Sequence, residues 1–475
     1  MRGQYEIGMI GLGVMGRNLL LNIADHGFSA AGYDKEASQT GALEREAGER
    51  PILAAPDLAA MAAALKSPRA VILLVPAGKV VDAVIGELVP LLDAGDLIID
   101  CGNSFFKDTD RRERELAGQG IHFMGAGVSG GESGARHGPS IMPGGRPEAY
   151  ERVRPVLEAA AAHVGGEPCV DYMGPGAAGH YVKMVHNGIE YAVMQLISEA
   201  YDIMRRGLGM GASQMQTVFA GWSKGEAASF LLEITADIFA EIDEDSGRPL
   251  LDMIRDQAHQ LGTGMWTSQD AMDLGVPVPA MDIAVAMRNL SSLKEERLAA
   301  AGVLGESRSA GERAATADER QALLDRLGSA FYAAMIVAYA QGMAQLKAAS
   351  TAYGYRLKLE AVARIWRGGC IIRAALLEDI RRAFMQAPEP DNILLDAAIA
   401  GRVLPRLDAL ATVAADAARM HVPAPGLMNA LAYIDAYRSE QLPANLVQAQ
   451  RDYFGAHRYE RIDREGSFHT EWTQL

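Results

Sequence analysis

The stretch Gly11-Leu12-Gly13-Val14-Met15-Gly16 decides the fold of this chain. It follows Ile7–Ile10, which has the pattern of a buried strand, and it opens the helical pattern Met15–His26. In that place the first glycine permits a tight turn, the second lets the backbone approach a pyrophosphate, and the third lets helix and strand pack closely. The helix N-terminus also attracts the anion. The stretch therefore predicts dinucleotide binding, with an ordinary glycine turn as the alternative.

Around this stretch, short apolar runs alternate with helix-length amphipathic segments. The expected strands are Ile7–Ile10, Ser29–Tyr33, Ala70–Val75, Leu97–Asp100 and His122–Met124, and the expected helices between them include Met15–His26, Val80–Leu92 and Asp108–Gly118. Such alternation implies βαβ units and a parallel sheet covered on both faces. We therefore expect an α/β Rossmann-like domain over residues 1–176.

The pattern changes at Gly174-Pro175-Gly176, and the sequence beyond this break is almost entirely helical in period. Residues 177–436 are predicted to form an all-helical domain for substrate binding and dimerisation. Residues 437–475 are a largely polar tail with few apolar anchors, which we expect to be ordered against another surface.

Composition narrows the function classes. The chain has 475 residues, with 45 Lys and Arg against 60 Asp and Glu, and its formal charge of −15 argues against a general nucleic-acid binder. The 3 cysteines have no metal-ligand spacing and are expected to be free thiols in a reducing compartment. No apolar run approaches a membrane span, and the N-terminus leads directly into a strand pattern. We expect a cytoplasmic protein.

Asp34 ends the second predicted strand, 18 residues after Gly16. An acidic side chain there can accept hydrogen bonds from the adenosine ribose and would repel a 2′-phosphate, which favours NAD. Lys35 is a cation that could still hold a 2′-phosphate. The alternative is that Asp34 caps the next helix.

Further candidate residues follow the later strands. Asn103 comes after Leu97–Asp100, and Ser129, Gly130 and Gly131 come after the strand near Met124. The carboxyl edge of an open α/β sheet is where ligands bind, and exposed backbone N–H groups with a hydroxyl suit a carboxylate or a hydroxyl-rich ligand. Ordinary turns would have the same composition.

A helix predicted to begin near Ala178 carries the most reactive set, His180, Lys183, His186, Asn187, Glu190 and Tyr191. At about 100° per residue, Lys183, Asn187 and Glu190 fall within about 60° of arc. One amine and one carboxyl about two turns apart could act as base and acid on a bound substrate, although an amphipathic surface helix would look the same. Distant candidate anion contacts are Thr263, Arg288, Arg451 and His457, each of which could equally be a surface charge or cap.

Together these residues resemble 6-phosphogluconate dehydrogenase, the decarboxylating family of the oxidative pentose phosphate pathway, in its long-chain form. The resemblance spans essentially the whole chain. Its most specific pieces are Gly127-Val128-Ser129-Gly130-Gly131-Glu132, Gly138-Pro139-Ser140-Ile141-Met142-Pro143-Gly144-Gly145, Gly179-His180-Tyr181-Val182-Lys183-Met184-Val185-His186-Asn187-Gly188-Ile189-Glu190-Tyr191 and Gln448-Ala449-Gln450-Arg451-Asp452-Tyr453-Phe454-Gly455-Ala456-His457.

The resemblance implies oxidative decarboxylation of 6-phosphogluconate to ribulose 5-phosphate and CO2, with NAD or NADP as hydride acceptor and no metal. Lys183 would take the proton of the C3 hydroxyl, and Glu190 would protonate C1 of the enediol. A lysine base needs a lowered pKa, which burial can supply.

The resemblance also assigns binding residues. The cofactor contacts it implies are Gly11, Leu12, Gly13, Val14, Met15, Gly16, Asp34, Lys35, Glu36, Val75, Pro76, Ala77 and Asn103. The substrate contacts it implies are Asn103, Ser129, Gly130, Gly131, His186, Asn187, Tyr191, Leu261, Thr263 and Arg288, with Arg451 and His457 delivered by the tail of the second subunit. A homodimer that exchanges its tails between active sites is therefore expected.

Two departures from the family pattern bear on ligands. The family usually places lysines near the phosphate where this chain has Leu261 and Met265. NADP-using members usually have an Asn-Arg-Thr-like triplet at Asp34-Lys35-Glu36 and a lysine at Pro76, so the resemblance also favours NAD. The competing hypotheses are a β-hydroxyacid dehydrogenase for an unphosphorylated acid and a non-catalytic dinucleotide-binding regulator.

Overall fold

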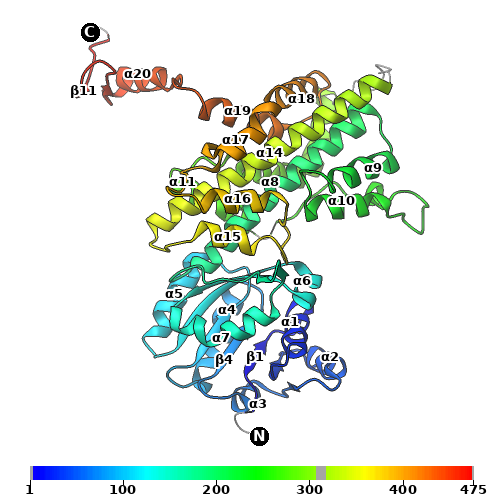
Figure 1. The fold of residues 1–475 in the computed structure, drawn as a ribbon, viewed down its shortest axis with the longest axis vertical. Coiled ribbons are helices and arrows are strands. Elements are labelled where there is room, and N and C mark those ends of the chain that lie inside the picture. Colours follow the sequence, from blue (N-terminus) through cyan, green and yellow to red (C-terminus); the bar gives the residue numbers. More distant parts are fainter. Residues whose placement is uncertain (1–3, 261, 306–316, 473–475) are drawn as a thin grey trace.

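A computed structural model describes residues 4–260, 262–305 and 317–472 of the chain. Figure 1 shows three parts in succession: an α/β domain, a helical domain and a tail that projects away from the helices. The predicted order of an α/β Rossmann-like domain followed by a large all-helical domain is confirmed.

The α/β domain is built on a seven-stranded sheet of order β3-β2-β1-β4-β5-β6-β7. Neighbouring strands are parallel except for β7, which runs antiparallel to β6. The order reverses beside β1, because β1 pairs with β2 on one side and β4 on the other, and ligands bind at such switch points. The strands are β1 (Ile7–Ile10), β2 (Ala30–Tyr33), β3 (Ile52–Ala54), β4 (Ala70–Leu73), β5 (Leu97–Asp100), β6 (His122–Ser129) and β7 (Ser140–Gly145).

Helices cover both faces of the sheet and bury its aliphatic side chains in two separate clusters. One face packs against α1 and α7, and the other against α3, α4 and α5. The helices of this domain are α1 (Val14–Asp25), α2 (Ala37–Ala47), α3 (Leu58–Ala64), α4 (Lys79–Leu88), α5 (Phe106–Ala117), α6 (Gly131–His137) and α7 (Pro147–Ala160), with a short 3₁₀ turn η1 (Val89–Leu91) and the ribbon β8 (His163–Val164) and β9 (Glu167–Pro168).

The sequence-based prediction of this sheet was incomplete. It omitted β3, which has only 3 residues, and β7, whose Pro143 and two glycines are unusual in a strand. It also ended the strand at Met124, whereas β6 continues to Ser129 because its glycines lie buried against the helical domain. The predicted strands are parallel to one another, as expected, but the sheet also has an antiparallel edge strand, β7, that the sequence did not predict.

The helical domain has one large core around two long helices, α8 and α14. Figure 1 shows them side by side. The helices are α8 (Ala178–Asp202), α9 (Ala212–Trp222), α10 (Phe230–Ala240), α11 (Thr263–Asp273), α12 (Pro279–Ser292), α13 (Lys294–Leu304), α14 (Ala317–Ala352), α15 (Leu359–Ile365), α16 (Leu376–Phe384), α17 (Ala397–Val403), α18 (Leu407–Arg419) and α19 (Pro425–Tyr437), with the short turns η2 (Ile203–Gly207), η3 (Leu250–Met253), η4 (Ile393–Leu395) and η5 (Leu404–Arg406).

One helix is long and apolar enough to cross a membrane by length and composition, Asp318–Ala352 within α14. The sequence-based expectation that no segment approaches such a span therefore needs this correction. In the fold, 83% of the apolar window is buried inside the protein. Its apolar side chains belong to the core of the helical domain.

The two domains meet where α8 lies on β6 and β7. Gly179 makes the contact possible, since a Cβ there would lie 2.2 Å from the Met142 carbonyl oxygen and 2.3 Å from that of Gly125. These neighbours are backbone atoms of paired strands and cannot easily move. Gly179 therefore fixes how closely the helical domain approaches the sheet.

We predict that Gly179→Ala lowers the free energy of unfolding by about 1–3 kcal/mol, because the added methyl group overpacks the domain junction. The urea concentration at the unfolding midpoint should fall accordingly. Gly221→Ala in α9 is the matched control, since its Cβ meets nothing within 4 Å. That change should be neutral or slightly stabilising, as alanine is the better helix former. Equal midpoints for both variants would contradict the close-contact argument.

Candidate active site

The helix α8 carries the predicted reactive residues into the junction between the domains. Lys183 is buried, with 6% of its surface exposed, and its backbone lies against β6. A Cβ at Gly127 would come within 2.3 Å of Lys183 Cβ. The glycine in the strand therefore allows the lysine to approach the sheet without a competing side chain.

A continuous set of hydrogen bonds connects the two domains beside Lys183. His186 Nε2 lies 3.1 Å from Ser129 Oγ, and His186 Nδ1 lies 3.0 Å from Asn187 Oδ1. Asn187 Nδ2 in turn donates to Thr263 Oγ1 at 3.0 Å. The structure thus brings together four residues that the sequence predicted from three separate stretches.

These bonds agree with a neutral His186. Its Nδ1–H can donate to the amide oxygen of Asn187, while Nε2 accepts from the Ser129 hydroxyl. Burial, together with the nearby charge of Lys183, holds the pKa of His186 well below its usual range. The imidazole ring is fully buried and uncharged.

Lys183 and Glu190 both lie close to one nitrogen of this imidazole. Lys183 Nζ is 3.5 Å and Glu190 Oε2 is 3.8 Å from His186 Nδ1. Burial lowers the pKa of the Lys183 amine, an effect that the charge of Glu190 opposes. Burial raises the pKa of the Glu190 carboxyl, against the charges of Lys183 and Arg288. Both groups are shifted towards their neutral forms, as an amine base and a carboxylic acid require.

The far end of the site holds a cation above an aromatic ring. The Arg288 guanidinium lies 3.4 Å from the centre of the Tyr191 ring, and Thr263 is buried beside them at the start of α11. Arg288 donates to the His259 carbonyl oxygen at 3.4 Å. Leu261, a predicted contact at this end, lies outside the described residues.

One part of the site was missed in the sequence, the turn between α15 and α16. The Ile371 backbone N–H donates to Ser129 Oγ at 3.4 Å, and Ser140 N–H donates to the Gly369 carbonyl oxygen at 2.7 Å. The Trp366 ring stands edge-on to His186 at 5.6 Å. Only the Gly368-Gly369 pair hints at this turn in the sequence, and nothing local indicates that it reaches Ser129.

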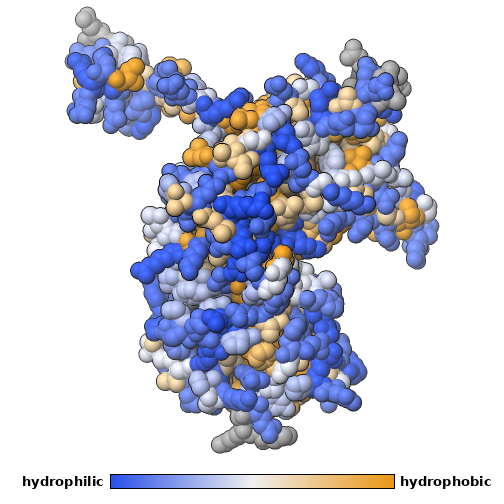
Figure 2. Space-filling model, in the orientation of Figure 1, coloured by the Kyte–Doolittle hydropathy of each residue, from blue (hydrophilic) through white to orange (hydrophobic). Residues whose placement is uncertain are grey.

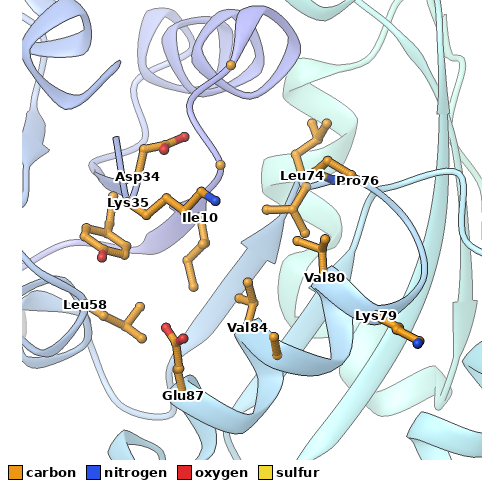
Figure 3. A pocket seen from close by; sticks show the side chains of 15 residues that line it. Ile10, Asp34, Lys35, Leu58, Leu74, Pro76, Lys79, Val80, Val84 and Glu87 are labelled. Atoms are coloured by element: carbon orange, nitrogen blue, oxygen red, sulfur yellow. The ribbon is translucent and has the colours of Figure 1, made fainter. Parts of the chain in front are cut away.

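The predicted cofactor stretch lines a separate cavity of about 590 Å³ in the α/β domain. Figure 3 shows Asp34 and Lys35 across this cavity from Pro76 and Val80, with Glu87 and Leu58 below. A Cβ at Gly16 would lie 1.8 Å from the Gly11 carbonyl oxygen, so the turn closes tightly, whereas a Cβ at Gly13 would meet nothing within 4 Å. The backbone beside Gly13 is therefore open to a ligand.

The Asp34 carboxylate holds the glycine turn in place through backbone hydrogen bonds. One carboxylate oxygen accepts from the Leu12 backbone N–H at 2.7 Å and the other accepts from Glu36 N–H at 2.9 Å. The alternative in which Asp34 caps the next helix is wrong, because α2 begins at Ala37 with Glu36 as its N-cap. Its negative charge stands at the edge of the cavity.

Asn103 stands exposed just beyond β5, as predicted. Its turn is held by Asp100, which accepts from Gly102 N–H at 3.0 Å and from Ser104 Oγ at 2.6 Å. His180 of α8 lies 3.0 Å from the Asp100 carbonyl oxygen through Nε2. The helix that carries Lys183 is thereby tied to the Asn103 turn, a role for His180 that its sequence position does not reveal.

Two predicted substrate residues are not brought to the site within one chain. Arg451 and His457 belong to the projecting tail, far from α8 in Figure 1. Among the residues that the structure describes, no cluster of three His, Cys, Asp or Glu side chains could hold a metal ion. The 3 cysteines are buried and free.

Comparisons with known proteins agree with this geometry over almost the whole chain. Residues 6–174 match the NAD binding domain of 6-phosphogluconate dehydrogenase, and residues 179–472 match the 6-phosphogluconate dehydrogenase C-terminal domain. The chain belongs to the 6-phosphogluconate dehydrogenase family. The resemblance expected from the sequence is confirmed.

Individual relatives extend along the full length. The Bacillus subtilis NADP(+)-dependent, decarboxylating 6-phosphogluconate dehydrogenase is 51% identical, with 99% of each chain covered. The Escherichia coli decarboxylating enzyme is 47% identical, again over 99% of both chains. The solved Plasmodium falciparum 6-phosphogluconate dehydrogenase, described with its cofactor NADP+ and its substrate 6-phosphogluconate, has a TM-score of 0.94 at 40% identity and covers 98% of this chain and 100% of its own.

These matches decide the class of enzyme, and the two competing hypotheses from the sequence are set aside. They confirm a dinucleotide cofactor. They give no support to a preference for NAD, since the Bacillus subtilis and Plasmodium falciparum proteins are both described with NADP.

Because His186 is buried, we predict that the free energy of unfolding depends on pH. Its pKa is lower in the folded chain than in the unfolded chain, so the unfolded chain binds more protons as the pH falls below about 6.5. The free energy of unfolding then decreases by about 1.4 kcal/mol per pH unit for this one proton. His186→Asn should remove that share of the slope between pH 7 and 5 in urea titrations. Equal slopes for the wild type and His186→Asn would contradict the argument.

Proposed function

We propose that this decarboxylating 6-phosphogluconate dehydrogenase uses Lys183 as its base and Glu190 as its acid. The single observation that supports these roles is the placement of a buried amine and a largely buried carboxyl on one helix, both within 3.8 Å of the neutral His186. The overall reaction oxidises 6-phosphogluconate and releases CO2 to give ribulose 5-phosphate.

The α/β domain fits a dinucleotide. The cavity lies at the switch point of the sheet, and the open backbone at Gly13 leads to the N-terminus of α1. Val14 and Val80 are unusually exposed, at 50% and 42%, as expected of side chains that a ligand covers. When bound, the nicotinamide supplies the hydride acceptor for C3 of the substrate.

Lys183 then takes part in two successive proton transfers at the C3 oxygen. As a neutral amine it removes the C3 hydroxyl proton, and C3 becomes a carbonyl. The bond from C2 to the carboxyl group breaks next, its electrons form the enediolate, and CO2 leaves. The protonated Lys183 donates to the developing oxyanion at C3, where a buried ammonium stabilises charge more strongly than in water.

Glu190 completes the reaction. Its raised pKa keeps it protonated at higher pH than a free glutamate, so it can donate a proton to carbon of the enediol while the Lys183 amine takes back the proton of the hydroxyl on the former C3, which becomes the ketone of ribulose 5-phosphate. In this scheme the new C–H bond forms at C1 of the product. Ser129, His186 and Asn187 hold the hydroxyl groups of the sugar between the two catalytic side chains.

Arg288, Tyr191 and Thr263 form the phosphate end of the proposed site. The guanidinium is stacked on the ring at 3.4 Å, which limits its rotation. Positions 261 and 265 supply no lysine here. Arg288 therefore contributes a larger share of phosphate binding than it would beside additional lysines.

We further propose a preference for NAD over NADP. Asp34 places a carboxylate at the mouth of the cavity, and its two backbone hydrogen bonds hold it there. A 2′-phosphate would be repelled by this charge. Lys35 and Lys79 also line the cavity and limit the size of the preference.

A homodimer with exchanged tails is part of the same proposal. The helix α13 has no buried residue and exposes Leu298, Val303 and Leu304, the last two at 84% each. The tail exposes Leu446 and Phe454, and Figure 2 shows apolar surface on it. Apolar surface of this extent is typical of an interface between subunits.

We predict that Lys183→Met abolishes turnover while the dissociation constant for NAD or NADP, measured by calorimetry, stays within about threefold of the wild type. The rate should fall by at least 10²–10⁴-fold, as for loss of a general base. Lys224→Met, at an exposed position, is the control. Residual turnover above a tenth of the wild-type rate would remove Lys183 from its role.

We predict that the wild type has a higher kcat/KM with NAD than with NADP, and that Asp34→Asn moves the ratio towards NADP by about tenfold, equivalent to about 1.4 kcal/mol. Asparagine keeps the shape and an acceptor oxygen but loses the charge. Asp93→Asn, at the opposite edge of the sheet and 79% exposed, should leave the ratio alone. A strong NADP preference of the wild type would refute the interpretation of Asp34.

A further inference from the structure

The tail is folded around one carboxylate. It consists of the helix α20 (Ala444–Gly455) and the two-stranded ribbon β10 (Tyr459–Glu460) and β11 (Ser467–Phe468). Asp452 is completely buried although both of its neighbours, Arg451 and Tyr453, are exposed. A carboxylate buried in so small a unit must be satisfied by donors from the same unit.

Four donors from the tail meet this carboxylate. Asp452 Oδ1 accepts from the Arg458 backbone N–H and from His469 Nδ1, each at 2.9 Å. Oδ2 accepts from Thr470 N–H at 3.0 Å and from Trp472 Nε1 at 2.9 Å. Burial alone would raise the pKa of Asp452, but these hydrogen bonds outweigh it and hold the pKa well below its usual range. The carboxylate thus joins the helix, the following turn and the segment after β11.

The turn that Asp452 holds is strained and contains His457. Ala456 and Arg458, on either side of it, have φ values of 50° and 61°, which non-glycine residues rarely adopt. The Ala456 N–H donates to the Asp452 carbonyl oxygen at 2.9 Å, so the backbone and the side chain of one residue fix both strained positions. The His457 ring consequently lies over Gly455, where a Cβ would come within 2.6 Å of its Nε2.

We propose that Asp452 is a positioning residue that holds Arg451 and His457 in the orientation in which they enter the partner subunit's active site. This inference rests on the tail exchange of the proposed function. All four bonds to the carboxylate lie within the tail, so the geometry exists before docking. A segment already ordered loses less conformational entropy when it binds, and substrate affinity benefits.

The decisive variant is Asp452→Asn. It preserves the shape but replaces one acceptor oxygen by an N–H donor, so two of the four donors lose their partner. We expect KM for 6-phosphogluconate to rise about tenfold or more, with kcat changed less than about threefold and the NAD dissociation constant unchanged. Asp463→Asn is the matched control, since that carboxylate is exposed and pairs with Arg461 in the turn between β10 and β11.

A graded variant separates positioning from loss of the folded tail. Trp472→Phe keeps an aromatic side chain, although a smaller one, and removes a single donor to Asp452. It should raise KM less than Asp452→Asn does, and hydrogen exchange at Arg458 and Thr470 should quicken in the same order. An unchanged KM in Asp452→Asn would overturn the proposal, as would a fall in NAD affinity as large as the rise in KM.

Hybrid dimers distinguish this proposal from the tail exchange itself. One subunit carries Lys183→Met with an intact tail, and the other carries Asp452→Asn with an intact Lys183. If tails are exchanged, the working site receives the intact tail and KM returns to the wild-type value. If KM stays raised in the hybrid, each tail serves its own subunit; the exchange fails, and with it the partner-site role of Asp452, while the KM rise in the Asp452→Asn homodimer still measures positioning by Asp452.

Discussion

The close approach of α8 to the sheet is the constraint on which the site depends. It is possible because glycines stand where the helix meets the strands, so that backbone lies directly on backbone at Gly144 and Gly179. At this distance His180 reaches the carbonyl oxygen of Asp100, and His186 reaches Ser129. Residues of two domains are thereby placed with the precision of a single packed core, which a flexible interface between domains would not provide.

The polar side chains buried by this approach are hydrogen-bonded to one another. Ser129, His186, Asn187 and Thr263 satisfy one another in sequence, each donating to or accepting from the next. Among the described residues, Lys183 forms no salt bridge, and its nearest polar contact is a neutral imidazole. A salt bridge would have kept the lysine charged. The network thus satisfies the buried polar groups at the domain junction without pairing the Lys183 amine with one of the described carboxylates.

Local patterns in the sequence predicted much of this arrangement. The glycine stretch after β1 and the polar face of α8 each depend on spacing within one element, and the structure has β1 and α8 where that spacing placed them. The contact of Ile371 with Ser129 spans 242 residues and leaves no periodic signal. The strand β7 was missed because Pro143 and its glycines are poor strand formers, and their close packing against α8 outweighs that preference.

The net charge of −15, which argues against a general nucleic-acid binder, acts only weakly on the site. Surface charges are screened over about 8–10 Å at physiological ionic strength, whereas a half-buried group is screened much less. Arg288 is such a group: its N–H groups face the His259 carbonyl and the Met194 sulfur, not a carboxylate, and burial lowers its pKa. A phosphate would give this guanidinium the bidentate partner that it lacks, and the gain is larger than for a solvated lysine. One well-held arginine can thus offset the absent lysines in a chain that is acidic as a whole.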